Sequence, residues 1–280
     1  MMRKVYITII MLALCACTYA TNWFGVSPTV FTTLQLDDSP LTTPKLGAGG
    51  GLGINYLMQK QHLILQIGAE ATYNHSRVSV EDSHLSYLMK YSEKWDSVVY
   101  SGLLDQRCDA SYTMAIRIPV MLGAEYEYLY FLAGAKLHLN LRGKAHSSAF
   151  LTTKGEILHL IGIVENAPLL GFDERSINNT NHISYSIDLR PSIEVGTVLY
   201  NRQRDNKMHL GLFAEYGLLN SLPRERHAEL LDVDMSQYMQ LNMNHIYTTR
   251  LVSRLNQMTI GIRFTTYLEM REGRYCKCVY

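Results

Sequence analysis

The sequence predicts an all-β fold, an eight-stranded antiparallel up-and-down β-barrel that crosses a membrane. Three observations predict it. Eight segments alternate polar and apolar residues with the period of two that defines a strand, and each is longer than the usual strand of about five or six residues. The connections between them are alternately short and long. The apolar face of the segments carries no charge, as a wall in contact with lipid requires.

Residues 1–20 have the pattern of a secretory signal peptide. Arg3 and Lys4 precede an apolar stretch of 13 residues, and small residues lead up to Ala20. The stretch is too short for a spanning helix of roughly 20 residues. We therefore expect export and cleavage near Ala20. An uncleaved anchor and lipid attachment at Cys17 are the alternatives.

Composition excludes several classes of protein. The chain has 26 Lys and Arg against 25 Asp and Glu, and loss of two basic residues with the signal leaves 24 against 25. No basic excess points to nucleic acid. After the signal, Cys108, Cys276 and Cys278 remain, an odd number that makes no disulfide framework. The last two lack a second pair at zinc-ligand spacing, so we expect neither a metal nor a cofactor.

The first four predicted strands are 23–36, 45–58, 62–76 and 112–126. In the first, apolar residues from Phe24 to Leu36 take the even positions. The second sets apolar residues against Lys45 and four glycines, an inward face rather than a phosphate-binding loop, because no Lys-Ser/Thr follows. The third and fourth set apolar residues against Glu70 and Arg117.

The last four predicted strands are 131–143, 182–200, 208–220 and 257–269. In the first of these, residues from Phe131 to Leu141 alternate with Lys136, His138 and Arg142. The other three alternate in the same way. No apolar run after the signal approaches ~18 residues, so we expect no spanning helix.

The connections supply an independent test of the barrel. The short ones are 59–61, residue 127 and 201–207, and the long ones are 37–44, 77–111, 143–181 and 221–256. Strict alternation is typical of membrane barrels with short periplasmic turns and long outer loops. An even strand count places both ends of the barrel domain, 21–269, in the periplasm, followed by a tail, 270–280. A further strand at 156–164, with a partner, would make ten.

The polar face of the strands predicts what fills the barrel. Eight strands leave a lumen only wide enough for side chains, so inward charges must pair with one another. Lys45 shares this face and completes six positive and five negative charges. The predicted lumen charge network consists of Glu70, Arg117, Glu125, Lys136, Arg142, Asp188, Arg190, Glu194, Glu215 and Arg263.

Tyrosines and prolines add two local predictions. Five tyrosines on the apolar parity near strand ends are expected to form interfacial girdles. They are Tyr56, Tyr73, Tyr126, Tyr185 and Tyr216. Pro119 and Pro191 lie inside predicted strands, where a missing N–H weakens the ladder. We interpret them as β-bulges that help the sheet curve.

The hairpin 116–136 resembles the PorT-like outer-membrane β-barrel family. Its first strand reads IRIPVMLGAEY and its second YFLAGAK, similar to the family's I-P-L-L-L and Y-F-x-x-G strands. The stretch 211–218, GLFAEYGL, is similar to the family's penultimate strand. The resemblance spans most of 22–269 and implies an outer-membrane barrel of Gram-negative bacteria, with a part in protein secretion in some members. It implies no catalytic residues, and the long outer loops and the tail depart from the family's pattern.

No sequence pattern supports catalysis. The apolar parity of the strands has no Ser or His, and G-x-S-x-G, H-E-x-x-H and Walker motifs are absent from the sequence. We therefore expect a non-enzymatic outer-membrane barrel with a filled lumen that anchors or presents the surface loops 77–111, 143–181 and 221–256. Its expected partners are outer-membrane lipid and envelope or secretion proteins. A small-solute pore, a lipid-modifying barrel enzyme and a soluble lipocalin-type barrel are the alternatives.

Overall fold

The computed structural model describes most of the chain after the expected signal segment. The residues that it describes are 20–81, 83–92, 95–157, 162–164, 174–201, 206–223, 226–227, 231–234 and 240–270. The predicted signal peptide and the tail after residue 270 lie outside them and stay predictions. In the described part of the chain no helix is long and apolar enough to cross a membrane.

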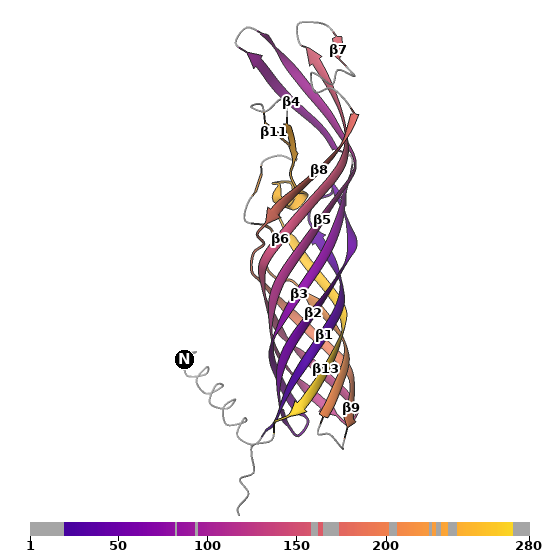
Figure 1. The fold of residues 1–280 in the computed structure, drawn as a ribbon, viewed down its shortest axis with the longest axis vertical. Coiled ribbons are helices and arrows are strands. Elements are labelled where there is room, and N and C mark those ends of the chain that lie inside the picture. Colours follow the sequence, from indigo (N-terminus) through magenta and orange to yellow (C-terminus); the bar gives the residue numbers. More distant parts are fainter. Residues whose placement is uncertain are drawn as a thin grey trace, which may run out of the picture.

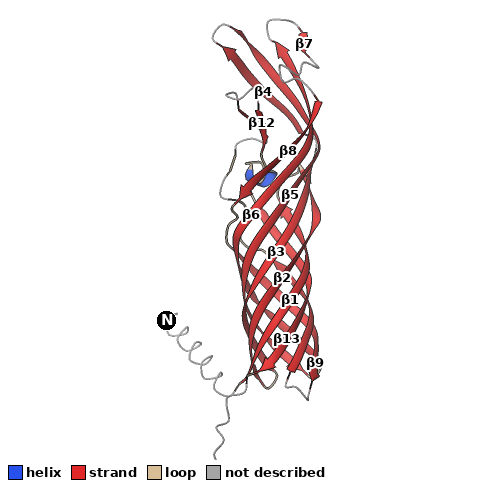
Figure 2. Ribbon diagram, viewed as in Figure 1, coloured by secondary structure: helices blue, strands red, loops and turns tan. Residues whose placement is uncertain are grey.

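Eight antiparallel strands close into a ring (Figures 1 and 2). Each strand pairs with the ring strands before and after it, and the last closes on the first, where Phe24 pairs with Leu268. The fold is thus an eight-stranded up-and-down barrel, as predicted. The ring strands are β1 (Thr21–Asp37), β2 (Thr42–Lys60), β3 (Leu63–Val80), β5 (Trp95–Tyr126), β6 (Leu129–Ile157), β9 (Asp188–Asn201), β10 (Asn206–Tyr216) and β13 (Leu255–Glu269).

The short connections gather at one end of the ring. Two-residue turns join β2 to β3 and β5 to β6, and their first residues, Gln61 and Glu127, have positive φ angles of 54° and 38°. Such left-handed residues match the twist of tight hairpins. The start of β1 and the end of β13 lie at this same end (Figure 1).

The outer connections contain more strand than the loop prediction allowed. β4 (Ser83–Ser92) pairs with β5, and β7 (Gly162–Val164) and β8 (Glu174–Ile183) pair with β6. A short hairpin of β11 (Leu231–Asp234) and β12 (Gln240–Met243) precedes the 3-10 helix η2 (Ile246–Thr248). All of these lie outside the ring, so the ten-stranded alternative is wrong.

The prolines do not mark the bulges. Pro119 pairs in register with Lys136, and Pro191 pairs in register with Ala135, so the bulge interpretation is wrong. Each proline lacks the N–H that would donate one hydrogen bond between the strands, but the residues on either side of it pair in an unchanged register. The register shifts lie instead between Asp105 and Cys108, between Met114 and Ala115, and between Lys45 and Ala48.

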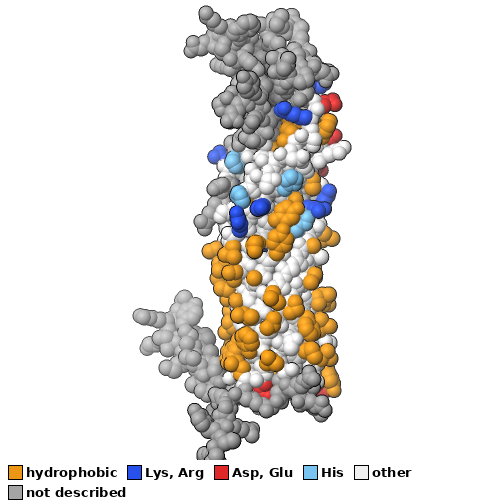
Figure 3. Space-filling view, in the orientation of Figure 1, with side chains coloured by type: hydrophobic (Ala, Val, Ile, Leu, Met, Phe, Trp, Pro, Cys, Tyr) orange, Lys and Arg blue, Asp and Glu red, His pale blue; other side chains and the backbone are white. Residues whose placement is uncertain are grey.

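The ring is apolar outside and polar inside. Outward residues such as Val30, Leu122 and Leu212 are about 60–70% exposed. Figure 3 shows hydrophobic side chains gathered around the part of the barrel toward the short turns, and we call this region the apolar band. On β6 the band runs from Leu129 to Leu141. At about 3.3 Å per residue and a tilt of about 40°, this stretch spans roughly 30 Å, the thickness of a bilayer's hydrocarbon core.

The tyrosine prediction holds at most positions. Tyr73, Tyr126 and Tyr216 are exposed at the borders of the apolar band, and Tyr56 is half-buried. Tyr185 is 8% exposed and packs in a cluster with Ile246 and Val252, so its place in a girdle is wrong. The reason is that the chain leaves the ring between β8 and β9, where the alternation no longer distinguishes lipid from interior.

Candidate functional site

The lumen of the barrel is the densest polar site of the described chain. Its buried ionisable side chains include six Lys or Arg and six Asp or Glu, so the interior is electrically neutral when His is uncharged. The cations are Arg107, Arg117, Lys136, Arg190, Lys207 and Arg263, and the anions are Glu70, Asp109, Glu125, Asp188, Glu194 and Glu215. Neutrality is what a closed interior requires, because an unpaired buried charge costs several kcal/mol.

A first group of contacts lies near the end of the barrel with the short turns. The Lys207 ammonium donates to Glu125 Oε2 at 2.9 Å and to Gln59 Oε1 at 2.7 Å. His209 Nε2 lies 3.1 Å from the same carboxylate. Lys207 also lies 4.8 Å from the ring centroid of Trp23, a cation–π contact. This group links β1, β2, β5 and β10 across the lumen at that end.

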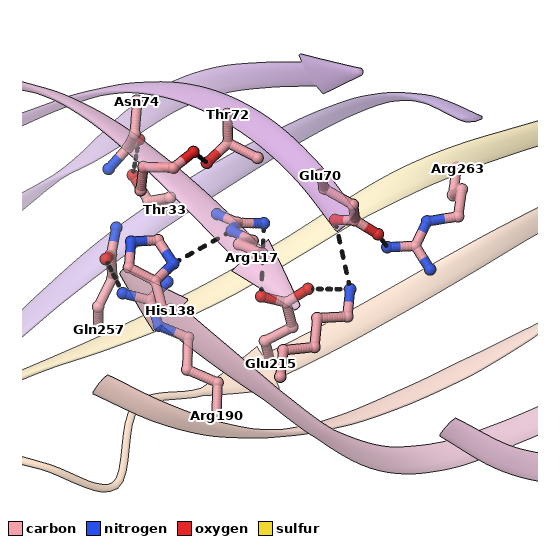
Figure 4. A network of polar contacts seen from close by, with 12 residues as sticks. Thr33, Glu70, Thr72, Asn74, Arg117, His138, Arg190, Glu215, Gln257 and Arg263 are labelled. Atoms are coloured by element: carbon pink, nitrogen blue, oxygen red, sulfur yellow. Dashed lines mark hydrogen bonds and ion pairs between the residues drawn. The ribbon is translucent and has the colours of Figure 1, made fainter. Parts of the chain in front are cut away.

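Arg263 joins two carboxylates across the middle of the lumen. Its guanidinium donates to Glu194 Oε2 at 2.6 Å and forms a short ion pair with Glu70, and Figure 4 shows the second of these contacts. Tyr130 donates its hydroxyl proton to Glu194 at 2.7 Å. A Cβ at Gly211 would lie 2.1 Å from the Tyr130 hydroxyl oxygen, so this glycine makes room for the ring.

Lys136 and Arg117 share Glu215 in the same layer. The Lys136 ammonium lies 2.5 Å from Glu215 Oε1 and 3.9 Å from Glu70 Oε2, and Arg117 Nη1 lies 3.5 Å from Glu215 Oε2. Arg117 also lies 4.5 Å from the ring centroid of Phe31. Glu70 and Glu215 therefore link three cations into one network (Figure 4).

A third group lies toward the outer end of the lumen. Arg190 Nε donates to Asp188 Oδ2 at 2.8 Å, and Arg190 Nη2 donates to Gln257 at 2.6 Å. His138 Nδ1 accepts from Arg117 Nε at 3.2 Å, and its Nε2 lies 3.1 Å from Asn140 Oδ1.

The segment 243–249, which contains η2, packs over the outer mouth of the barrel. Arg107 pairs with Asp109 at 2.8 Å, and Asp109 accepts the backbone N–H of Ile246 at 2.7 Å. Burial opposes the charge of Asp109, but Arg107 holds its pKa below the usual value. Burial lowers the pKa of His245 to about 4 although Asp109 acts in the other direction, so the imidazole is neutral at neutral pH.

Nine of the ten residues of the predicted network are buried in the lumen, and Arg142 is the exception. β6 has one more residue than β5 at the bulge, because Arg142 pairs with Met114 and Asn140 pairs with the next residue, Ala115. The extra residue reverses the parity of β6, and Arg142 is exposed on the outer wall. The prediction for Arg142 is therefore wrong.

The predicted network omits several buried charged or imidazole side chains, among them Arg107, Asp109, Lys207 and His209. Lys207 and His209 lie in β10. Lys207 was assigned to a turn although it continues the inward parity of the strand. His209 lies on the polar parity of the predicted strand 208–220 and was left out of the predicted network. Arg107 and Asp109 were assigned to an outer loop. The alternation of polar and apolar residues is a poor guide to Arg107 and Asp109, because a bulge interrupts it at Gln106, which has a positive φ of 51°.

The described contacts of the lumen are ion pairs, hydrogen bonds and aromatic contacts. In the described part of the chain no group of three or more His, Cys, Asp or Glu side chains is placed to hold a metal ion. The His side chains of the lumen contact Arg, Glu and Tyr groups and no Ser or Cys nucleophile in the contacts described above. The network therefore fits a structural role.

A closed ring with an apolar outer wall and a neutral packed interior defines the chain as an eight-stranded transmembrane β-barrel. Neither the scan against protein-family models nor the search of curated proteins gives a match. The resemblance of 116–136 to PorT-like barrels thus stays a prediction.

Solved structures of membrane proteins show a distant likeness to the chain. Ail, the attachment invasion locus protein of Yersinia pestis, solved in complex with the heparin analogue sucrose octasulfate, is 10% identical. The match covers 89% of this chain and 99% of Ail, with a TM-score of 0.29. Neisserial surface protein A is 9% identical over 86% of this chain and 95% of its own, with a TM-score of 0.27. Scores this low give no basis for transferring a function.

Proposed function

We propose that the protein is a non-enzymatic outer-membrane barrel whose filled lumen anchors a projecting β-sheet, and that this sheet binds other envelope or secretion components. The apolar band and the expected signal peptide support the outer membrane as its location. The outward positions of the described apolar band carry no Ser or His, which disfavours a lipid-modifying enzyme.

The continuous β5–β6 hairpin is the observation that carries the proposal. Its pairing extends from Tyr126 and Leu129 at the turn to Val98 and Ile157, with two register shifts along the way. The apolar wall ends near Met114, so about 16 of the β5 residues that pair with β6, from Val98 to Thr113, lie beyond it. At about 3.3 Å per residue they extend roughly 50 Å along the strand. β4 pairs with β5 and β8 pairs with β6, so these strands widen the extension into a sheet (Figure 1).

The paired lumen charges disfavour a pore. The side chains of Arg117, Lys136, Glu215 and Arg263 are at most 1% exposed, and the segment 243–249 covers the outer mouth. Eight strands enclose little more than their own side chains. In planar bilayers the purified protein should give no steady single-channel current. Steady currents would support the small-solute pore and overturn the filled-lumen proposal.

Labelling of Cys108 tests whether the projecting sheet faces the outside of the cell or the periplasm. Cys108 is a partly exposed free thiol on β5, beyond the apolar band. In a variant with Cys276→Ser and Cys278→Ser, a membrane-impermeant maleimide should label Cys108 on intact cells, and a further Cys108→Ser change should abolish the label. Labelling only after the outer membrane is permeabilised would place the sheet in the periplasm and contradict the proposal.

A partner of the sheet can be sought by crosslinking. A photo-crosslinking amino acid at Asp105, on the extension, should capture envelope proteins that the same amino acid at Lys60, at the turn end, does not. Identical capture at both positions would argue against a partner that recognises the sheet.

A further inference from the structure

Basic and imidazole side chains gather on the outer wall just beyond the apolar band (Figure 3). Lys45, Arg77, Arg142 and Lys144 are exposed there, and His75 and His146 are half-buried. We call these six residues the outer basic patch.

Strand register makes the patch contiguous. Lys45 on β2 pairs with Arg77 on β3, and Arg77 is followed across the sheet by Ala110 and then His146. One step nearer the band, His75, Tyr112 and Lys144 form a parallel row. Four adjacent strands at about 4.8 Å spacing make the patch about 15 Å wide. A headgroup with more than one phosphate would fit across it.

Two bulges create the patch. The extra residue of β6 turns Arg142 and Lys144 outward, whereas Lys136 on the same strand points into the lumen. A register shift in β2 between Lys45 and Ala48 accompanies the pairing of Lys45 with Arg77. The strands therefore change from an apolar to a basic outer face at one height, where the apolar band ends.

The patch carries charge that the protein does not neutralise. In the described part of the chain, Lys45, Arg142 and Lys144 have no carboxylate partner, in contrast to the lumen cations. Arg77 donates to His75 Nε2 at 3.2 Å, and His75 stacks on Tyr112 at 4.5 Å. The outward positions of the four strands at this height include no Asp or Glu.

Position relative to the bilayer indicates the partner. Phosphate groups of membrane lipids lie directly beyond the hydrocarbon core, and clustered Lys and Arg attract them. Below the patch, Tyr73, Met114 and Leu141 continue the exposed apolar wall on which acyl chains can lie. A soluble polyanion would match the charge of the patch, but it has no acyl chains to contact the apolar wall.

We propose that the outer basic patch binds the phosphate groups of a phosphorylated glycolipid in the surrounding outer leaflet, whose acyl chains lie on the apolar wall below. The assignment of the leaflet rests on the proposed function, because the sheet must face outward. The lipid would fix the height of the barrel in the membrane and neutralise the patch.

The test compares two variants with equal loss of charge. Arg142→Gln/Lys144→Gln removes two patch cations. Lys60→Gln/Arg254→Gln removes one exposed cation at the turn end and one exposed cation just before β13, a strand that carries no residue of the patch. Binding of lipid A to the full-length folded protein in detergent is measured by native mass spectrometry, and retention of fold is checked by heat-modifiable migration in gels.

The patch variant should bind lipid A about 30-fold more weakly, and the control should bind within about 3-fold of the parent. Lipid A without phosphates should bind the parent as weakly as lipid A binds the patch variant. Equal weakening in both variants, or none in either, would overturn the proposal. Tighter binding of a soluble polysulfated sugar than of lipid A would assign the patch to an external glycan instead.

Failure of this inference and failure of the proposed function are distinguishable. If lipid A binding ignores the patch while Cys108 is labelled from outside, only the lipid site is wrong. If Cys108 is reached only from the periplasm, the orientation fails and the lipid assignment fails with it.

Discussion

Glu215 gives the sharpest test of the filled lumen. Its carboxylate lies 2.5 Å from the Lys136 ammonium and 3.5 Å from Arg117 Nη1, and all three side chains are at most 1% exposed. At an effective dielectric constant of about 20, these contacts correspond to Coulomb energies of about 7 and 5 kcal/mol before desolvation is subtracted. Glu215→Gln keeps the shape of the side chain and leaves two buried cations beside a neutral amide.

We expect Glu215→Gln to lower the free energy of unfolding by about 3–5 kcal/mol, because breaking a buried pair leaves an uncompensated charge. The assay is urea unfolding in lipid vesicles, followed by heat-modifiable migration and circular dichroism. A second change, Lys136→Met, restores neutrality and should recover at least half of the loss. Glu127→Gln, at an exposed turn, is the matched control and should change stability by less than about 0.5 kcal/mol.

The outcome that would refute this reasoning is a loss below about 1 kcal/mol for Glu215→Gln with no recovery from Lys136→Met. That result would mean that water reaches Glu215 and solvates the charges. The lumen would then be open, and the pore alternative would replace the anchor.

Two further predictions concern packing and pH. Gly211→Ala should lower the free energy of unfolding in urea by about 1–3 kcal/mol, because the new Cβ would lie 2.1 Å from the Tyr130 hydroxyl oxygen. Gly50→Ala is the control and should be tolerated, because the nearest atom to its Cβ is the Thr29 carbonyl oxygen at 3.3 Å. Acidification should loosen the segment over the outer mouth. The folded-state pKa of His245, about 4, lies below the unfolded value of about 6.5, so its stability contribution is present above pH 6.5 and is lost as pH falls toward 4. The protection factors of the amides of 244–250, which correct for the pH dependence of intrinsic exchange, should fall in that window. His245→Gln should remove the fall that begins near pH 6.5 and leave only the titration of Asp109 below its usual pKa. Protection factors that do not change with pH in the parent would contradict the assignment.

The sequence predicted the ring well because lipid and lumen impose opposite polarity on alternate residues. Each ring strand, from β1 to β13, overlaps a predicted segment, and inward residues such as Glu70 and Arg263 are where the parity placed them. Beyond the membrane both faces of a strand contact water or protein, so alternation no longer reports which side is inside. For that reason the strands in 77–111 and 143–181 were predicted as loops.

Single extra residues account for most of the misplaced side chains. The bulge before Arg142 reverses the parity of β6, and the bulge at Gln106 hides the inward placement of Arg107. A bulge depends on how two strands pair, so the sequence of one strand alone does not reveal its position. Pro119 shows the converse, because a residue expected to mark a bulge lies in regular register.

The central claim is that the apolar face of the barrel contacts lipid. Nitroxide labels at Leu122, Leu212 and Ile262, in a Cys108→Ser background without the tail cysteines, test it most directly in proteoliposomes. The account predicts that oxygen, which partitions into lipid, relaxes these three labels more than a water-soluble nickel complex does, with the reverse at Lys144. Greater access of the nickel complex at Leu122, Leu212 and Ile262 would contradict the transmembrane barrel.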